Sequence, residues 1–295
     1  MTRVLVTGAG GMLGQDLLAV LRSRDDLTVT AATRATLDIT DAEAVRAAVT
    51  GHDVVFNTAA WTDVDGAEQA EATATAVNGD GVAHLARACA DTGARLLHVS
   101  TDYVFPGDAG TPYPEDAPTD PVNAYGRSKL AGERAVVRFL PDTGYVVRTA
   151  WLYGAHGPNF VATMLRLAEQ RETLDVVDDQ QGQPTWSYAL GTRLVALADA
   201  ALAGRAPAGI YHGTCSGRTT WYGLARAVFT LAGLDPDRIR PTTSDRFPRP
   251  AARPAYSVLG HDRWAAARLE PLPDWHETLS DAFSSPTPPA PWKVA

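Results

Sequence analysis

The sequence predicts an α/β protein with a doubly wound parallel sheet and a smaller C-terminal lobe. Three observations support this prediction. Short apolar runs alternate with helical stretches as far as about residue 153. These runs are nearly continuous in apolar residues, as expected of strands that helices cover on both faces. A glycine-rich turn joins the first apolar run to the first helical stretch, a common device at the start of such a sheet.

The first half of the chain reads as strands and helices in strict alternation. Strands are expected at Val4–Val6, Leu27–Thr30, Val54–Asn57, Arg95–Ser100 and Tyr145–Thr149, with helices at 13–24, 41–50, near 68–92 and at 124–138. Because parallel strands need crossover connections, this order favours one sheet with helices on both sides. We assign residues 1–153 to this first domain.

The pattern loosens after residue 153 and indicates a second lobe over residues 154–283. Its expected elements are helices at about 158–170, 186–203 and 220–232 and strands at Leu174–Val177 and Gly209–His212. Parts of 174–215 are expected to pack back onto the first domain. Five prolines between Pro236 and Pro254 indicate an irregular ordered loop, and four more in 284–295 predict a flexible tail.

Composition excludes several classes of partner. The net charge is −8 and the only lysines are Lys129 and Lys293, so no basic run tracks a nucleic acid. No apolar run approaches the ~18 residues that span a membrane. The first strand begins by Val4 and leaves no room for a signal peptide, so a cytoplasmic location is expected. Cys89 and Cys215 are too few for a disulfide framework and are interpreted as small buried residues.

The first turn carries a dinucleotide-binding pattern. Glycines in a G-x-x-G-x-x-G spacing let backbone amides approach a pyrophosphate at a helix N-terminus, although a tight turn alone uses glycines too. The strand before it and the amphipathic helix after it favour the cofactor interpretation. The spacing resembles the extended branch of the short-chain dehydrogenase/reductase superfamily. The candidate residues are Gly8, Gly11, Met12, Leu13 and Gly14.

The end of the second strand bears on the choice of cofactor. An NAD enzyme usually places an acid there, whereas this chain has Arg34, a cation that suits a 2′-phosphate. We therefore expect NADPH to be preferred, with NADH as the lesser cofactor; the alternative is that Arg34 is a solvated surface residue. The superfamily resemblance adds Asp38 and Ile39 beside the adenine. At the third strand end the candidates are Asn57, Ala59 and Ala60.

Tyr125 and Lys129 are the main catalytic candidates. Four residues apart, they share one helix face, so the ammonium is expected to lie beside the phenol and to lower its pKa. The superfamily resemblance makes Thr101, at the end of an apolar strand, the residue that binds the substrate carbonyl. It also suggests that Asn78 holds a relay water, with helix packing as an equal alternative. His98 lies in an apolar strand and is interpreted as a core residue.

Several further motifs resemble the dTDP-4-dehydrorhamnose reductase family. They occur in the family's order from residue 3 to about 280: Ser100–Phe105, Ala131–Glu133, Arg148–Gly154, Asp179–Thr185, Gly209–His212, Thr219–Trp221 and Arg253–Leu259. The resemblance implies an NADPH-dependent reduction of the 4-keto group of a dTDP-4-keto-6-deoxy-hexose, most directly dTDP-4-dehydro-L-rhamnose to dTDP-L-rhamnose. It also allows a homodimer.

The substrate candidates follow from the same resemblance. Tyr103 stands where nucleotide-sugar dehydratases need a carboxylic acid, which disfavours elimination of water. Trp151 is either a wall of the sugar pocket or a core aromatic, and Arg253 either pairs with the diphosphate or is solvated. Gly66 stands where many members have lysine, and no ligand cluster assigns a metal. The full set is Val64, Thr101, Asp102, Tyr103, Trp151, Asn159, Gln183 (with Thr185 as a further hydrogen-bonding candidate) and Arg253.

Two alternatives stay open at this stage. One is a 4-ketoreductase for another dTDP-deoxysugar of antibiotic or glycan biosynthesis, which needs the same cofactor and catalytic residues. The other is a binding protein similar to the regulatory β subunit of methionine adenosyltransferase, which shares the scaffold. The intact Thr101, Tyr125 and Lys129 set favours turnover.

Overall fold

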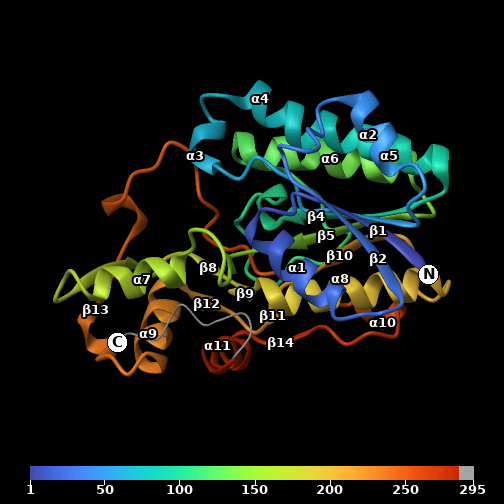
Figure 1. Cartoon of the computed structure of the whole chain (residues 1–295). Coiled ribbons are helices and arrows are strands. Elements are labelled where there is room, and N and C mark those ends of the chain that lie inside the picture. The colour runs from blue at the N-terminus through green and yellow to red at the C-terminus, as the bar shows by residue number, and fades with distance from the viewer. Residues whose placement is uncertain (286–295) are drawn as a thin grey trace.

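A six-stranded, wholly parallel sheet forms the centre of the molecule (Figure 1). The computed structural model describes residues 1–285, so the predicted tail lies almost entirely outside the described residues. In spatial order the strands are β10 (Gly209–His212), β5 (Gly144–Thr149), β4 (Arg95–Thr101), β3 (Val54–Asn57), β1 (Thr2–Thr7) and β2 (Leu27–Ala32). The predicted fold class is confirmed.

Helices cover both faces of this sheet, which explains the continuous apolar runs. One layer holds α2 (Ala42–Val49), α5 (Val82–Thr92) and α6 (Ala124–Phe139); the other holds α1 (Met12–Arg22) and α8 (Ser187–Leu202) (Figure 1). Alternate strand residues feed two cores: Val4 and Val6 pack with α1 and α8, whereas Leu5 packs with the opposite layer. A polar residue in the middle of such a strand would be buried on either face.

The C-terminal half forms a separate core and also completes the central sheet. Strand β10 and helix α8 lie with the first domain, because β10 pairs with β5 and α8 packs on α1. The remaining core is built around Val161, Leu224, Phe229 and Leu279. Its elements are α7 (Phe160–Ala168), β7 (Leu174–Val177), α9 (Trp221–Leu231), β13 (Ile239–Thr242) and α11 (Trp275–Ser284).

Shorter elements connect these layers. The paired short strands are β6 (Leu152–Tyr153) with β9 (Thr185–Trp186), β8 (Gln181–Gly182) with β12 (Thr219–Thr220), and β11 (Cys215–Ser216) with β14 (Leu272–Asp274). A short helix, α10 (Arg263–Ala266), lies near β10. Within residues 1–285, no helix has both the length and the apolar character to cross a bilayer.

The helix expected near 68–92 is interrupted. The structure has α3 (Val64–Ala67), α4 (Glu71–Thr75), a π-helical turn at Ala76–Gly81 and then α5. The Asp63 carboxylate accepts a hydrogen bond from Gly66 N at 2.9 Å and caps α3. The helical segment therefore begins earlier in the sequence than expected. The π-helical turn contains Asn78, whose side chain bonds to the main chain of Trp61. Such turns accompany functional sites more often than chance.

A strap of residues 243–257 runs from the C-terminal lobe up to α3 (Figure 1). Asp65 fastens it there, because its carboxylate accepts from Ala251 N at 3.2 Å and pairs with the Arg253 guanidinium at 3.0 Å. Asn123, at the start of α6, donates to Ala252 O at 2.9 Å. The proline-rich loop therefore joins the two halves of the molecule beside the start of α6.

Candidate active site

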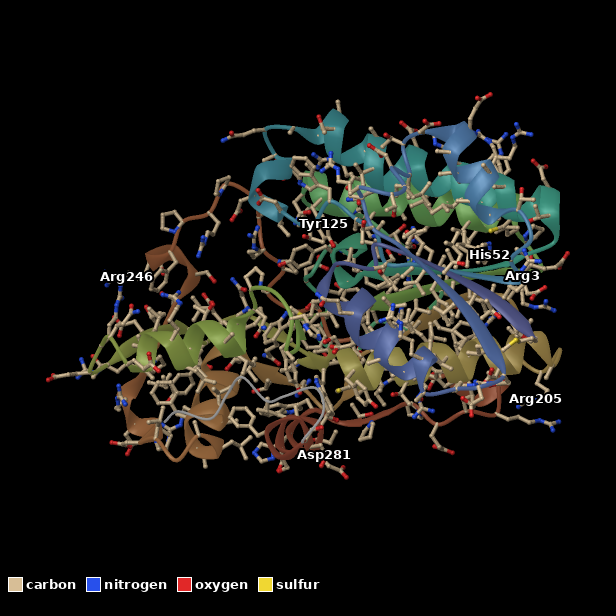
Figure 2. The ribbon with its side chains drawn as sticks, viewed as in Figure 1. Arg3, His52, Tyr125, Arg205, Arg246 and Asp281 are labelled. Atoms are coloured by element: carbon tan, nitrogen blue, oxygen red, sulfur yellow. The ribbon has the colours of Figure 1, made fainter. Side chains whose placement is uncertain are left out.

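The site lies at the carboxyl ends of the parallel strands. Thr7 lies beside Asn57, and Thr101 lies beside Thr149, in the registers of their strands. Ligands of open α/β sheets bind at this edge. Figure 2 places Tyr125 at one end of the sheet and His52 and Arg3 at the other.

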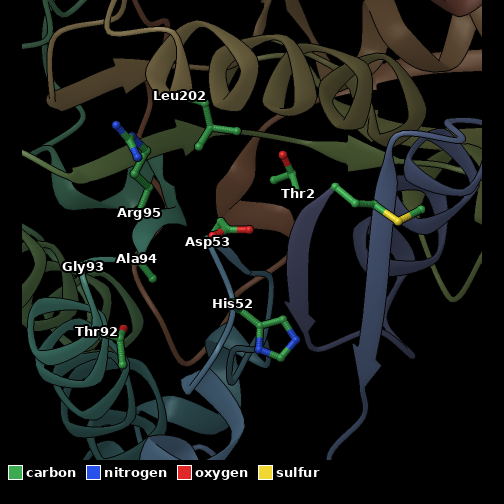
Figure 3. A pocket seen from close by; sticks show the side chains of 9 residues that line it. Thr2, His52, Asp53, Thr92, Gly93, Ala94, Arg95 and Leu202 are labelled. Carbon is green, nitrogen blue, oxygen red and sulfur yellow. The ribbon is translucent and has the colours of Figure 1, made fainter.

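A hollow of about 310 Å³ lies at the opposite, amino ends of β1, β3 and β4 (Figure 3). Thr2, His52, Asp53 and Arg95 are among the residues that line it. It contains none of the predicted site residues, and the catalytic chemistry of the chain lies elsewhere. The candidate site is therefore the carboxyl edge of the sheet.

Three glycines form a cradle at the start of α1. Gly8 has φ +70°, and a Cβ there would lie 2.5 Å from Ala59 N. A Cβ on Gly14 would lie 2.4 Å from Gly8 O, so the helix can approach the turn only through glycine. Gly11 N donates to Gly8 O at 2.9 Å, and no side chain of residues 1–285 caps α1. The amides at this helix start, including those of Met12 and Leu13, fit a pyrophosphate.

The end of β2 adjoins the cradle. Ala9 N donates to Ala32 O at 3.0 Å, which brings the turn beside the strand that leads to Arg34. Arg34 is exposed, whereas Ile39 is buried. Hydrogen bonds from the main chain and hydroxyl of Thr40 hold the pKa of Asp38 below its ordinary value, with the Arg34 charge acting in the same direction. An exposed cation at this position suits a cofactor phosphate.

Replacing Arg34 by alanine is expected to raise the KM for NADPH about tenfold, because one charge-assisted contact of ~1.4 kcal/mol is lost. The KM for NADH should stay within about twofold of the wild-type value, since NADH has no 2′-phosphate. Steady-state kinetics with both cofactors measures this, and Arg46→Ala, another exposed arginine, is the matched control. Equal changes for both cofactors would make Arg34 a bystander.

The side chain of Asn57 makes its hydrogen bonds to other residues of the protein. It accepts hydrogen bonds from the Thr7 hydroxyl at 2.7 Å and from Ala59 N at 3.1 Å, and its amide meets His98 Nδ1 at 2.9 Å. These bonds tie the ends of β1, β3 and β4 together. Asn57 is fully buried, so its side chain shapes the cradle while the partly exposed Ala59 and Ala60 form its accessible wall.

Helix α6 is positioned by two residues at its start. Asn123 caps it by accepting from Gly126 N at 2.8 Å. A Cβ on Gly126 would lie 2.1 Å from Tyr103 O, so only glycine lets this turn lie on the strand end. The rings of Tyr103 and Tyr125 then meet edge to face, 5.8 Å apart. Sequence reasoning missed Gly126 as a site residue, although it stands inside the Tyr125–Lys129 motif.

Thr101 and Asp102 are hydrogen-bonded to each other, and both influence the Tyr125 phenol. The Thr101 hydroxyl donates to Asp102 Oδ1 at 3.0 Å and accepts from Tyr103 N at 3.2 Å. Burial raises the pKa of Asp102 to about 6, against hydrogen bonds with Ser257 and Thr101. Burial also raises the pKa of Tyr125, the Asp102 charge adds to this, and a hydrogen bond with Thr101 opposes it.

The direction of this shift corrects one expectation. Lys129 was expected to lower the pKa of the Tyr125 phenol, yet the net shift in the structure is upward. The cause is that burial and the neighbouring carboxylate disfavour the phenolate. Tyr125 is consequently protonated at neutral pH, the state that a proton donor needs.

Lys129 is buried beneath this group. Its ammonium donates to Val99 O at 2.7 Å, and the residue is only 2% exposed. Burial lowers the pKa of Lys129 to about 8, although the Glu133 charge acts the other way. The lysine therefore loses its charge close to the physiological range.

The value of kcat/KM for NADPH is expected to be constant near neutrality and to fall above about pH 8. Below that pH Lys129 carries its charge; as the pH rises through 8 the ammonium deprotonates and its donor strength is lost. This parameter reports groups of the free enzyme, so a pH profile measures the pKa directly. A flat profile up to pH 10 would contradict the role given to the ammonium.

Asn78 supports the catalytic helix. Its side-chain oxygen accepts from Trp61 N at 2.9 Å, and its amide donates to Trp61 O at 3.0 Å and to Ser128 Oγ at 2.9 Å. Ser128 in turn donates to Tyr125 O at 2.7 Å. With these bonds made, the geometry favours the packing role over the water-relay role.

The predicted substrate residues separate into two groups. Val64 begins α3 beside the strap, and Arg253 bonds to Asp65 and, at 3.0 Å, to Ala251 O. The charges of Asp65, Arg253 and Asp102 all act on the pKa of the Tyr103 phenol, so these groups lie near Tyr103. Sequence reasoning missed Asp65, because a single surface acid carries no signal until the strap is folded over it.

Three other candidates are used within the protein. Gln183 is buried and bonds to the Thr214 hydroxyl and to both Leu259 N and Leu259 O. Thr185 is fully buried; its hydroxyl donates to Gln183 O and accepts from Cys215 N. Asn159 caps α7 through Ala162 N and donates to Gly154 O at 2.9 Å. These bonds give all three a scaffolding role, because their polar side-chain atoms are occupied by the protein.

Trp151 follows β5 with φ 47°, and its ring stacks on Trp221. Among residues 1–285, no group of three or more His, Cys, Asp or Glu side chains is arranged to hold a metal.

The parallel sheet, the glycine cradle and the Thr101, Tyr125 and Lys129 arrangement define an extended short-chain dehydrogenase/reductase. Residues 1–287 match the family described as RmlD substrate binding domain, and the chain belongs to that family. The resemblance predicted from the motifs is thereby confirmed.

Known relatives span nearly the whole chain. A dTDP-4-dehydrorhamnose reductase of Streptomyces griseus is 60% identical, covering 95% of this chain and 93% of its own length. A dTDP-4-keto-6-deoxy-D-glucose reductase of Streptomyces niveus is 52% identical over 95% and 96% of the two chains. The structure of a dTDP-4-dehydrorhamnose reductase of Bacillus anthracis in complex with NADP has a TM-score of 0.88 and 35% identity, covering 95% and 98%. These relatives confirm that the chain is an enzyme of the reductase class.

Proposed function

We propose that this chain reduces the 4-keto group of a dTDP-4-keto-6-deoxy-hexose with NADPH, and that its substrate is dTDP-4-dehydro-L-rhamnose, giving dTDP-L-rhamnose. The observation that carries the proposal is the position of the Tyr125 ring at the carboxyl end of β4, edge to face with Tyr103, two residues after Thr101. A proton donor at this edge, beside a glycine cradle, suits carbonyl reduction. The relative with 60% identity is named for this reaction.

Each catalytic residue has a defined task in this proposal. Bound NADPH supplies the hydride that reduces C4 of the sugar. Tyr125 gives its phenolic proton to the carbonyl oxygen, so its O–H bond breaks as the hydroxyl of the product forms. Thr101 donates its hydroxyl proton to that oxygen when substrate is bound, in place of the bond that it makes to Asp102 Oδ1 in the structure. The Lys129 ammonium, which donates to Val99 O in the structure, would hold the cofactor's ribose hydroxyls.

The two halves of the chain bind different ligands in this proposal. We assign the cofactor to the domain of residues 1–153 and the sugar nucleotide to the region where this domain meets the lobe of residues 154–283. Arg253 is the cation proposed for the diphosphate; its guanidinium has donors beyond those that bond to Asp65 and Ala251 O. Tyr103 in place of an acid supports reduction over dehydration.

A coupled assay tests the substrate. NADPH oxidation is followed with dTDP-4-keto-6-deoxyglucose in the presence and absence of a 3,5-epimerase, and the product is identified by NMR. Turnover only with the epimerase, giving dTDP-L-rhamnose, is the expected result. Turnover without it would support the second candidate, reduction of the unepimerised keto-sugar, which the 52% identity to a reductase of that name favours. NADPH binding with no turnover on either sugar would favour a binding-protein role instead.

A further inference from the structure

Trp151 lies beside the catalytic strand end in an unusual conformation. It follows Thr149, the register partner of Thr101, by two residues. Its φ of 47° belongs to the left-handed region, where a bulky side chain is rare and persists only when its surroundings fix it. Neighbouring residues must therefore hold the indole in this conformation.

The indole is fixed by residues of the C-terminal lobe. The rings of Trp151 and Trp221 stack with 3.5 Å between their centroids and 8° between their planes. Trp221 is itself held, because its Nε1 donates to Gln180 Oε1 at 3.1 Å and Phe160 packs 4.7 Å from its ring centre. The Trp151 carbonyl accepts from Thr185 N at 3.2 Å, which fixes the backbone beneath the ring.

Gly182 leaves the space that the indole needs. A Cβ on Gly182 would lie 2.5 Å from Trp151 Cε2 and 2.7 Å from Nε1. The short antiparallel pair β8–β12 sets Gly182 opposite Thr219, two residues before Trp221. One small sheet therefore positions both the residue that supports the indole and the residue that makes room for it.

We propose that Trp221 and Gly182 are positioning residues for Trp151, and that this arrangement lets the enzyme distinguish the keto-sugar from its 3,5-epimer. The inference rests on the proposed function. Both rings keep partly exposed surface. The 6-deoxy sugar carries an apolar methyl group on C5, and epimers at C5 place that methyl on opposite sides of the ring. An indole held in one position contacts the methyl group of only one epimer, whereas a mobile indole accommodates both epimers.

The test uses Trp221→Leu, Trp221→Phe and Gly182→Ala. Trp221→Leu and Gly182→Ala are expected to raise the KM for the epimerised keto-sugar at least tenfold and to reduce its preference over the unepimerised sugar. The KM for NADPH should change less than twofold, because Trp221 and Gly182 belong to α9 and β8 and not to the glycine cradle. Trp221→Phe, which keeps a stacking ring, should stay within about threefold of wild type.

Two further comparisons separate positioning from general stability. Tyr222→Leu removes the neighbouring aromatic residue of α9, which packs under Arg226 and not on Trp151, and should leave the sugar KM unchanged. A Trp151→Phe, Trp221→Leu double variant should be no worse than Trp151→Phe alone, since Trp221 acts through Trp151. Additive losses, or an effect of Tyr222→Leu equal to that of Trp221→Leu, would overturn the proposal.

The proposal stays testable if the proposed function fails. Should the wild-type chain turn over neither sugar, calorimetric titration with dTDP-L-rhamnose replaces the kinetic measurement. Weaker binding by Trp221→Leu and Gly182→Ala, with Tyr222→Leu at the wild-type affinity, would support the positioning role. Equal affinity in all four proteins, or no binding by the wild type, would overturn it.

Discussion

Tyr125→Phe is expected to lower kcat by about 1000-fold or more while NADPH still binds. The substitution removes only the phenolic oxygen, and a positioned general acid contributes typically 10²–10⁴-fold. The raised pKa of Tyr125 makes it the protonated group at neutral pH. The neighbouring Asp102, with a pKa of about 6, is mostly ionised there and is a poor substitute.

Stopped-flow fluorescence of bound NADPH measures cofactor binding by the variant, and steady-state kinetics measures its kcat. The dissociation constant for NADPH should change less than threefold, because the ring that packs on Tyr103 is kept. Tyr222→Phe, in the C-terminal lobe, serves as the matched tyrosine control. A Tyr125→Phe enzyme with more than a tenth of wild-type kcat would show that another group donates the proton.

Lys129→Met is expected to lose activity by about 100-fold or more without loss of the fold. Methionine fills a similar volume, and the substitution removes the cost of burying a charge. The lost ammonium is the one that donates to Val99 O. Activity and thermal stability should therefore change independently, which is unusual for a residue that is 2% exposed.

Thermal unfolding at several pH values provides the control. Since the pKa of Lys129 is about 8 in the folded protein against 10.5 for a free lysine, the unfolded chain binds more protons between these values. The contribution of Lys129 to the free energy of unfolding of the wild type should thus rise as the pH increases from 8 to 10.5. Lys129→Met should lack that contribution. A variant that unfolds at a much lower temperature, with activity lost in proportion, would make Lys129 a structural residue.

The parts of the fold that the sequence predicted are those with a local cause. Val4, Leu5 and Val6 are apolar in succession because neighbouring strand residues face two different cores. Gly8 and Gly14 have no space for a side chain, so their spacing carries information by itself. Tyr125 and Lys129 share a helix face by periodicity alone. Each of these can be predicted from neighbouring positions in the chain, even where the close contact itself joins distant residues, as between Gly8 and Ala59.

The remaining features depend on contacts between distant segments. Gln183 was predicted to bind substrate, yet Thr214 and Leu259 take up its polar atoms. Asp65 acquires its role only when the strap returns to α3 from the C-terminal lobe. The upward shift of the Tyr125 pKa likewise depends on Asp102 and on burial, neither of which motif spacing reveals.

The most direct test of the proposed reduction is transfer of deuterium from the cofactor. The wild-type enzyme is given NADPH deuterated at both C4 positions of the nicotinamide, together with dTDP-4-keto-6-deoxyglucose and the 3,5-epimerase in ordinary water. NMR and mass spectrometry of the product should show dTDP-L-rhamnose with one deuterium, located at C4 of the sugar. A product with hydrogen at C4, or a keto-sugar recovered unreduced while NADPH stays bound, would contradict the proposal.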